Sequence, residues 1–423
     1  MREARSGLIG EIAKPEASGS TPGQPTPLET RSRAHYSHTV SDTSLTNVEV
    51  AIVGGGIAGA SLAYFLAERG VNDVVLLERE SAPAFHASGR SARTLLEFDM
   101  HPVVQRLKIA GGRFLRRPPD GFCDEPLLKR NGAMRLLDEK AWKDAIARES
   151  ELHDEGLEFE LLDATAACSR VGVLDPSSFA GAVHLPQGGF IDVPGLISAF
   201  LRGAQRAGHE LRTRSQVRAV REVAGGELTS LLTDSGEVRA RVVVNAAGAW
   251  STELGRMAGA SPIELVAMRR SIATFSMPQH LDAGEVGSWP LVWSDPQSVY
   301  FRPGFDGLMV CAMDEVPSAP CDAACIDGVF EAASERLARL APRFLPAGIP
   351  PTARRWAGLR TFASDGAPVV GFDPLRAGFF WLVGQAGCGI ETSAVLGRLA
   401  ADLIAVGTSE VFDSAALSPR RFA

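Results

Sequence analysis

The glycine-rich segment at residues 54–59 restricts the possible folds of this chain more than any other feature. Its sequence, Gly-Gly-Gly-Ile-Ala-Gly, satisfies the pattern G-x-G-x-x-G. The residues before it, Val48–Val53, are typical of a buried parallel strand, and a helix is expected from about Gly59 to Arg69. Because such a helix start offers unpaired N–H groups beside a tight turn, the segment predicts a pyrophosphate site. The expected contacts are Gly54, Gly56, Ile57, Ala58 and Gly59.

An acidic residue at the end of the next predicted strand supports the prediction that this segment binds a dinucleotide. Val74–Leu77 forms that strand, and Glu78 follows it, where a carboxylate can accept hydrogen bonds from a ribose 2′-OH. The adjacent Arg79 is included among the expected contacts. The alternative is a tight turn that binds no ligand. Strand, turn, helix and acid together predict dinucleotide binding, and they leave FAD and NAD open.

Three later segments favour FAD. Residues 86–91 offer hydroxyl and N–H groups to a phosphate and sugar chain, and residues 245–250 end a buried strand with small side chains. Residues 387–392 form a glycine turn before the last predicted helix, whose positive end can face the flavin N1/C2=O edge. From these segments and a short strand at 217–220, the expected cofactor contacts are Ser88, Gly89, Arg90, Ser91, Val217, Ala246, Gly248, Trp250, Gly387, Gly389, Ile390 and Thr392.

In the order of these segments the sequence resembles the D-amino-acid oxidase and glycine oxidase superfamily of FAD-dependent oxidoreductases, and within it D-arginine dehydrogenase. The resemblance runs from Val48 to Arg421 and is most specific at 86–91, 161–163, 167–169, 244–250, 356–360 and 378–393. It implies an α/β fold in which a Rossmann-like FAD-binding domain is interleaved with a substrate domain built on an antiparallel sheet. The expected segments are 48–132, 186–261 and 355–412 for the FAD-binding domain, 133–185 and 262–354 for the substrate domain, 1–47 for a disordered extension, and 413–423 for a tail.

The resemblance also assigns candidate catalytic residues. Arg360, in Trp-Ala-Gly-Leu-Arg, matches the family's substrate-carboxylate arginine, and a guanidinium binds a carboxylate bidentately. Arg270 and Tyr300 match substrate-contacting positions of D-arginine dehydrogenase. The alternatives are a surface salt bridge for each arginine and a core position for Tyr300. His86 is expected near the flavin, where it either orients a loop or affects flavin reactivity.

Other positions depart from D-arginine dehydrogenase. Ala133 stands where that enzyme has a glutamate, so the acid that would pair with a basic side chain is missing. Thr94, Leu96 and Asp99 replace the His, Thr and Tyr of its substrate loop, although Asp99 could restore an anionic partner. The family tyrosine of the last glycine turn is Cys388. These departures predict a substrate other than D-arginine.

The function implied is FAD-dependent oxidation of the C–N bond of a small amino acid, most simply a D-amino acid. Hydride passes from Cα to flavin N5, and the resulting imine hydrolyses to a 2-oxo acid and ammonia; no protein base is assigned. Either oxygen or a quinone serves as electron acceptor. The alternatives are a sarcosine- or proline-type secondary-amine oxidase or dehydrogenase, a flavoprotein subunit of a larger complex, and an NAD-only dehydrogenase, in which residues 384–392 have no evident role.

The composition of the chain limits the kinds of binding partner that can be expected. A formal net charge of −7 over 423 residues gives no support for nucleic-acid binding, and no apolar run is long enough for an integral membrane segment. The six irregularly spaced cysteines predict reduced thiols in a cytoplasmic protein. Cys321 and Cys325 lack a second pair with ligand spacing, so no metal site is expected. Residues 1–47, rich in Ser, Thr and Pro, could instead reflect an upstream start codon, and the oligomeric state stays open.

Overall fold

The computed structural model describes residues 45–304 and 307–423. Most of the extension predicted for residues 1–47 therefore lies outside the described residues. Residues 45–47 belong to the first strand, β1 (Leu45–Val53), which begins before the predicted start at Val48. No described helix is both long enough and apolar enough to cross a membrane.

Eight of the described strands form a sheet around β1. Its order is β10-β11-β12-β1-β2-β9, with β20 beside β12 and β19 beside β20. β1 pairs in parallel with β2 and β12, and β12 pairs in parallel with β20. The further strands of this sheet are β2 (Val74–Leu77), β9 (Glu210–Arg212), β10 (Val217–Glu222), β11 (Thr229–Thr233), β12 (Gly236–Asn245), β19 (Val369–Phe372) and β20 (Phe379–Val383).

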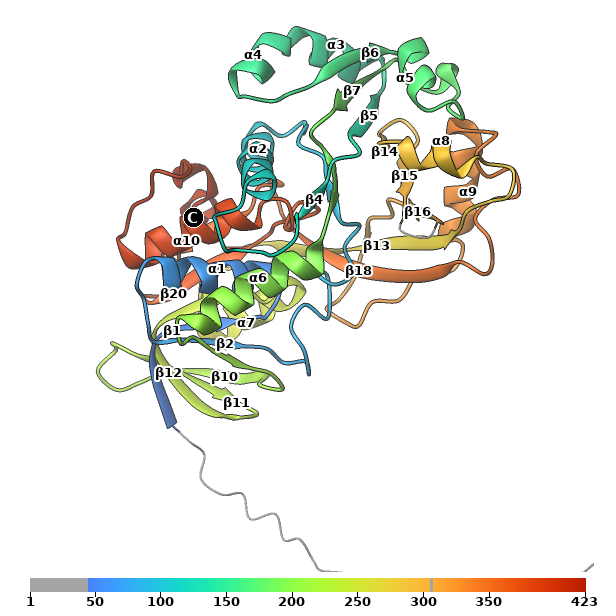
Figure 1. The fold of residues 1–423 in the computed structure, drawn as a ribbon. Coiled ribbons are helices and arrows are strands. Elements are labelled where there is room, and N and C mark those ends of the chain that lie inside the picture. Colours follow the sequence, from blue (N-terminus) through green and yellow to red (C-terminus); the bar gives the residue numbers. More distant parts are fainter. Residues whose placement is uncertain (1–44, 305–306) are drawn as a thin grey trace, which may run out of the picture. The chain divides into compact units, whose positions relative to one another are not determined.

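Helices cover both faces of this sheet, which explains why its central strands are apolar without alternation. Val50 and Ile52 face a core that contains α1 (Ile57–Glu68), α2 (Pro102–Arg116), α6 (Val193–Arg206) and α10 (Ser393–Ala405). Ala51 points to the opposite face, where α7 (Ser251–Ala258) packs. α1 contacts α6 and α10 directly (Figure 1). We call this sheet with its five helices the first lobe.

A second sheet contains nine of the described strands. Its order is β17-β13-β16-β15-β14-β5-β7-β6, with β18 beside β13. The strands are β5 (Ala133–Leu137), β6 (Glu160–Asp163), β7 (Gly181–Leu185), β13 (Leu265–Ser276), β14 (Leu291–Ser294), β15 (Val299–Pro303), β16 (Gly307–Cys311), β17 (Val316–Pro317) and β18 (Arg354–Ala363). With α3 (Glu139–Ala147), α4 (Glu149–Asp154), α5 (Ala164–Arg170), α8 (Ala283–Ser288) and α9 (Val329–Leu340), they make the second lobe. A small third sheet joins β3 (Thr94–Leu95), β8 (Gly189–Ile191) and β4 (Leu128–Lys129).

The mixed α/β class predicted from the sequence is confirmed, and two details differ. The second sheet is not purely antiparallel, because β14 runs parallel to β5 where the two chain segments of this lobe meet. Residues 355–363, expected in the FAD-binding domain, pair with β13 as part of β18. The first later strand of the eight-stranded sheet is β19, which starts at Val369. An apolar strand pattern shows that a segment is extended, but it does not show which sheet the strand joins.

Candidate functional site

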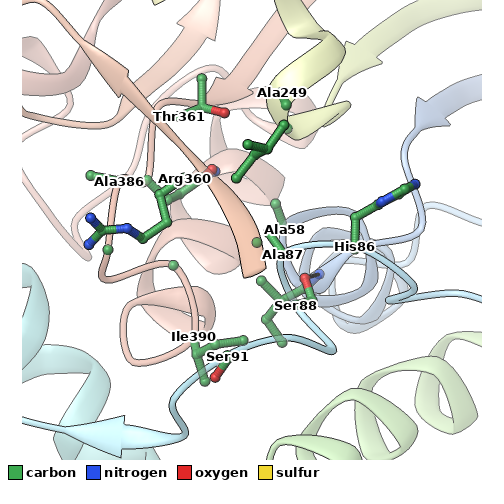
Figure 2. Close-up of a pocket in the computed structure, with 18 of the residues that line it drawn as sticks. Ala58, His86, Ala87, Ser88, Ser91, Ala249, Arg360, Thr361, Ala386 and Ile390 are labelled. Carbon is green, nitrogen blue, oxygen red and sulfur yellow. Dashed lines mark hydrogen bonds between the residues drawn. The ribbon is translucent and has the colours of Figure 1, made fainter. Parts of the chain in front are cut away.

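A cavity of about 570 Å³ is lined by residues from both lobes. The turn after β1, the segment that follows β2, the residues after β12, strand β18 and the turn before α10 all contribute to its wall (Figure 2). The volume lies within the usual range for cofactor sites. Segments that are distant in sequence therefore surround one space.

The turn after β1 is built for close backbone approach. Gly54 has a φ of +116°, and a Cβ there would lie 2.3 Å from the carbonyl oxygen of Ala246. The N-cap of α1 is Gly56, which has no side chain to cap the helix, and the Ile57 N–H donates to Ser88 Oγ at 3.0 Å. A Cβ at Gly56 would meet only the Ser88 hydroxyl, at 3.2 Å. This open helix start fits a pyrophosphate.

Glu78 is held in a fixed orientation at one end of the cavity. Its Oε2 accepts from the Gly55 N–H at 2.9 Å, and its Oε1 accepts from the Glu80 N–H at 2.8 Å. Each carboxylate oxygen has a second lone pair, so the side chain can still accept ribose hydroxyls. The Arg79 guanidinium lies 4.0 Å from the centre of the Trp250 ring, and Val217 also lines the cavity. These groups fit the nucleoside end of a dinucleotide.

His86 lies at this nucleoside end. Its Nε2 is 2.9 Å from Glu80 Oε1, and its ring centre is 4.6 Å from that of Trp250. Figure 2 shows the His86 and Arg360 side chains on opposite sides of the pocket. The structure therefore does not bring His86 together with the other candidate catalytic residues. These contacts order the loop after β2, and an effect of His86 on flavin reactivity stays a prediction.

Arg90 joins the two lobes. Its Nη1 donates to the carbonyl oxygens of Ala323 and Ala357, at 3.0 and 3.2 Å, and its Nη2 pairs with Asp322. Although Arg90 lines the cavity, these partners take up much of its hydrogen-bonding capacity. It therefore fixes a loop of the second lobe against the first.

Most of the predicted cofactor contacts line the cavity. Gly59 does not, because it supports the fold: a Cβ there would lie 2.1 Å from the Gly54 carbonyl oxygen. Gly89 has the same role against Ala84, and Thr392 is buried, donating to the Cys388 carbonyl oxygen. The residues on the wall are Gly54, Gly56, Ile57, Ala58, Glu78, Arg79, Ser88, Arg90, Ser91, Val217, Ala246, Gly248, Trp250, Gly387, Gly389 and Ile390.

Arg270 and Arg360, called the arginine pair below, lie together on the cavity wall. They project from the neighbouring strands β13 and β18, and their Nη2 atoms lie 2.6 and 2.9 Å from the same oxygen, Oε1 of Glu315. Their side chains are only 6% and 17% exposed, and both Nε atoms are buried with no hydrogen-bond partner among the described residues. Burial and the neighbouring Arg270 lower the pKa of Arg360. The pair is thus a cationic site whose donors are incompletely used.

Tyr300 lines the same part of the cavity. Its ring stacks on Trp293, with ring centres 4.5 Å apart. Burial raises the pKa of Tyr300 well above its usual value, so its hydroxyl stays protonated at neutral pH and can donate a hydrogen bond. Arg270, Tyr300 and Arg360, the three residues expected to contact the substrate, all line this cavity.

Three ionisable residues on the wall were not predicted as a group: the partly buried Asp99 and the buried Lys108 and Glu391, called the lysine cluster below. The Lys108 ammonium lies 2.8 Å from Asp99 Oδ2 and 3.2 Å from Glu391 Oε1, and it donates to the Leu96 carbonyl oxygen at 3.2 Å. Burial raises the pKa of Glu391 to about 7, against the opposing effect of Lys108. Burial works to lower the pKa of Lys108, but the two carboxylates outweigh it.

The sequence holds a weak signal for this cluster and none for Glu315. Lys108 is the charged exception on the buried face of α2, between Val104 and Leu115 at helical spacing. Glu315 stands in a connecting segment without a motif. No group of His, Cys, Asp or Glu side chains in residues 45–304 and 307–423 is arranged to hold a metal ion.

Comparisons of the sequence and of the structure with known proteins point to the same family. The family model "DAO: FAD dependent oxidoreductase" matches residues 49–403. Human mitochondrial sarcosine dehydrogenase is 25% identical over 415 residues, covering 92% of this chain but only 42% of the relative. Glycine oxidase from Geobacillus kaustophilus is 26% identical over 368 residues, covering 84% of this chain and 92% of that protein. The chain thus spans less than half the length of the mitochondrial relative.

Two solved structures share the fold. The structure of glycine oxidase from Geobacillus kaustophilus superposes with a TM-score of 0.74 at 24% identity, covering 88% of this chain and 98% of that one. L-proline dehydrogenase from P. horikoshii gives a TM-score of 0.76 at 21% identity, covering 90% of this chain and 98% of that one. With the glycine turn, Glu78 and the open start of α1 at one cavity, this chain belongs to the DAO family of FAD-dependent oxidoreductases, and FAD is its cofactor.

Proposed function

We propose that this protein oxidises the C–N bond of a small amino acid that carries one carboxylate, most simply a D-amino acid. The observation that carries the proposal is the arginine pair, two buried guanidiniums on the cavity wall that share a single acidic partner. A buried cation with unused donors favours an anionic ligand, and a guanidinium matches a carboxylate in shape. The substrate carboxylate would bind there.

The residues around the pair would orient the substrate. Arg360 would hold the carboxylate, while the Tyr300 hydroxyl would donate a hydrogen bond to it. The turn before α10 lies directly against the pair, since a Cβ at Gly387 would be 2.7 Å from Arg360 Nη1. FAD, when bound, supplies the hydride acceptor, and the substrate is converted to an imine that water hydrolyses to a 2-oxo acid and ammonia. Fixing the carboxylate restricts the orientation of Cα, which raises the rate.

The cavity wall near Tyr300 favours an uncharged substrate side chain. Leu96, Ile272 and Met313 line it with apolar atoms. Asp99, which could have paired with a basic side chain, is already bound to Lys108 at 2.8 Å. We therefore expect D-amino acids with apolar side chains to be better substrates than D-arginine. The particular resemblance of this sequence to D-arginine dehydrogenase stays a prediction.

A secondary-amine substrate is the second candidate. The names of the similar proteins include sarcosine dehydrogenase and L-proline dehydrogenase, and the arginine pair would serve the carboxylate of such substrates equally well. Anaerobic mixing of the FAD-loaded protein with D-amino acids, sarcosine and L-proline would separate the candidates by which compound bleaches the flavin. Bleaching by the single chain would also exclude the alternative of an inactive subunit.

The proposal is tested by Arg360→Ala. Loss of the buried cation should lower kcat/KM by at least about 100-fold, the equivalent of roughly 3 kcal/mol of lost transition-state binding. Arg354→Ala is the matched control, since Arg354 lies on the same strand but is exposed. Near-normal turnover of Arg360→Ala would remove this residue from its role. Because no protein base is assigned, kcat/KM should rise with pH through one ionisation and then level off.

A further inference from the structure

Glu315 occupies part of the site assigned above to the substrate carboxylate. It follows β16 in a short connection to β17, and one of its oxygens, Oε1, contacts both members of the arginine pair. Its side chain is 55% exposed, whereas the two guanidiniums are almost enclosed. The carboxylate therefore approaches the pair from the open side of the cavity.

The backbone beside Glu315 is firmly anchored. The neighbouring Asp314 accepts hydrogen bonds from the N–H and the hydroxyl of Ser271, the residue that follows Arg270 on β13. Asp314 is itself buried. This anchor keeps the Glu315 side chain within reach of the arginine pair, so its contact belongs to the construction of the site and is not a chance surface contact.

Charge counting shows what Glu315 does to the site. Two guanidiniums carry two positive charges, and Glu315 cancels one, leaving one unit for a ligand. The remaining positive charge matches one further carboxylate. A second ligand carboxylate would have to displace Glu315 or lie beside it, and like charges in a poorly solvated site repel strongly.

We propose that Glu315 is a specificity-determining residue that restricts the site to amino acids with a single carboxylate, because it takes the place of a second one. This inference rests on the proposed function, since it assumes that the arginine pair binds the substrate carboxylate. The class excluded is dicarboxylates, such as acidic amino acids and iminodiacetate. Removing the Glu315 charge would free a position beside the arginine pair for a second substrate carboxylate.

The test measures binding of unreactive acids to the FAD-loaded protein, with propionate as the monocarboxylate and succinate as the dicarboxylate. Perturbation of the flavin absorbance reports the Kd of each. The wild type should bind propionate more tightly than succinate. Glu315→Gln should tighten succinate by at least about 10-fold and propionate by less than about 3-fold, because only succinate gains a partner for the freed cation. Glu315→Asp, which keeps the charge, should retain the wild-type order.

Two controls separate the possible failures. Glu264→Gln removes one exposed carboxylate elsewhere in the second lobe and should leave both Kd values unchanged. Arg360→Lys should weaken both acids in every background. If Arg360→Lys weakens propionate but Glu315→Gln leaves the succinate-to-propionate ratio unchanged, the role of Glu315 is wrong and the proposed function stands. If Arg360→Lys has no effect on either acid, the assigned carboxylate site itself is wrong.

Discussion

Two buried ionic groups lie on the wall of one cavity, and they differ in how completely their hydrogen bonds are used. In the lysine cluster, Lys108 has an acceptor for each of its three donors. In the arginine pair, two guanidiniums share one carboxylate oxygen, and their Nε atoms have no partner among the described residues. A cation with a complete set of partners stabilises the fold, whereas a cation with unused donors can bind a ligand.

The same difference extends to solvent access. The Glu391 side chain is buried, so its charge is balanced only by its protein neighbours. Glu315 is half exposed and can be solvated when a ligand displaces it. We therefore expect substitutions in the lysine cluster to change stability, and substitutions in the arginine pair to change binding.

The largest stability effect is expected for Lys108→Met. It leaves the buried carboxylate of Glu391 and the partly buried carboxylate of Asp99 without their cation. The free energy of unfolding should fall by about 3 kcal/mol, the lower end of the range for broken buried pairs, because Glu391 can protonate and Asp99 is partly solvated. Denaturant unfolding measures the change. Lys143→Met, which removes an exposed ion pair to Glu139, should cost under about 0.5 kcal/mol. A loss below about 1 kcal/mol for Lys108→Met would show that the cluster does not stabilise the fold.

A smaller effect is expected for Glu391→Gln, and it depends on pH. The pKa of Glu391 in the folded chain is about 7, above that of an exposed glutamate, so the folded state binds its proton more tightly than the unfolded state. Its contribution to stability is complete below about pH 4.3 and is lost as the pH rises towards 7. The Tm of the wild type relative to Glu391→Gln should therefore fall between pH 4.5 and 7. A constant Tm difference over this range would contradict the raised pKa.

The smallest stability effect is expected for Arg360→Met. Arg270 keeps its contact with Glu315, and a buried Nε without a partner is removed, so the free energy of unfolding should change by less than about 1 kcal/mol. The same substitution should abolish tight binding of propionate. If Arg360→Met instead destabilises the protein as strongly as Lys108→Met, the arginine pair is structural and the distinction between the two groups fails.

The nucleotide end of the cavity was predictable because it depends on consecutive residues. A positive φ at Gly54 and a helix that starts at Ile57 follow from local backbone preferences, which a six-residue motif expresses directly. Glu78 could be placed because it ends the adjacent strand. Gly59 and Gly89 were predicted to contact the cofactor, but they do not line the cavity, and their missing Cβ atoms allow close backbone packing.

The other end of the cavity was predictable only in part. The resemblance to a family selected Arg270, Tyr300 and Arg360, and the structure places all three on one wall. It did not select Glu315 or Lys108, because neither belongs to a motif. His86 lies against Trp250, and its expected place near the flavin stays a prediction.

The sequence by itself determined the α/β class and the dinucleotide turn, since these depend on periodicity and on short motifs whose conformation is local, and its resemblance to known proteins indicated the family. Only the tertiary structure decided which charges meet. The pairing of β13 with β18 brings Arg270 and Arg360 to one carboxylate, and the packing of α2 against α10 brings Lys108 to Glu391. The physical reason is that electrostatic energy depends on the distance and burial of the charges in space, which their separation along the chain does not specify.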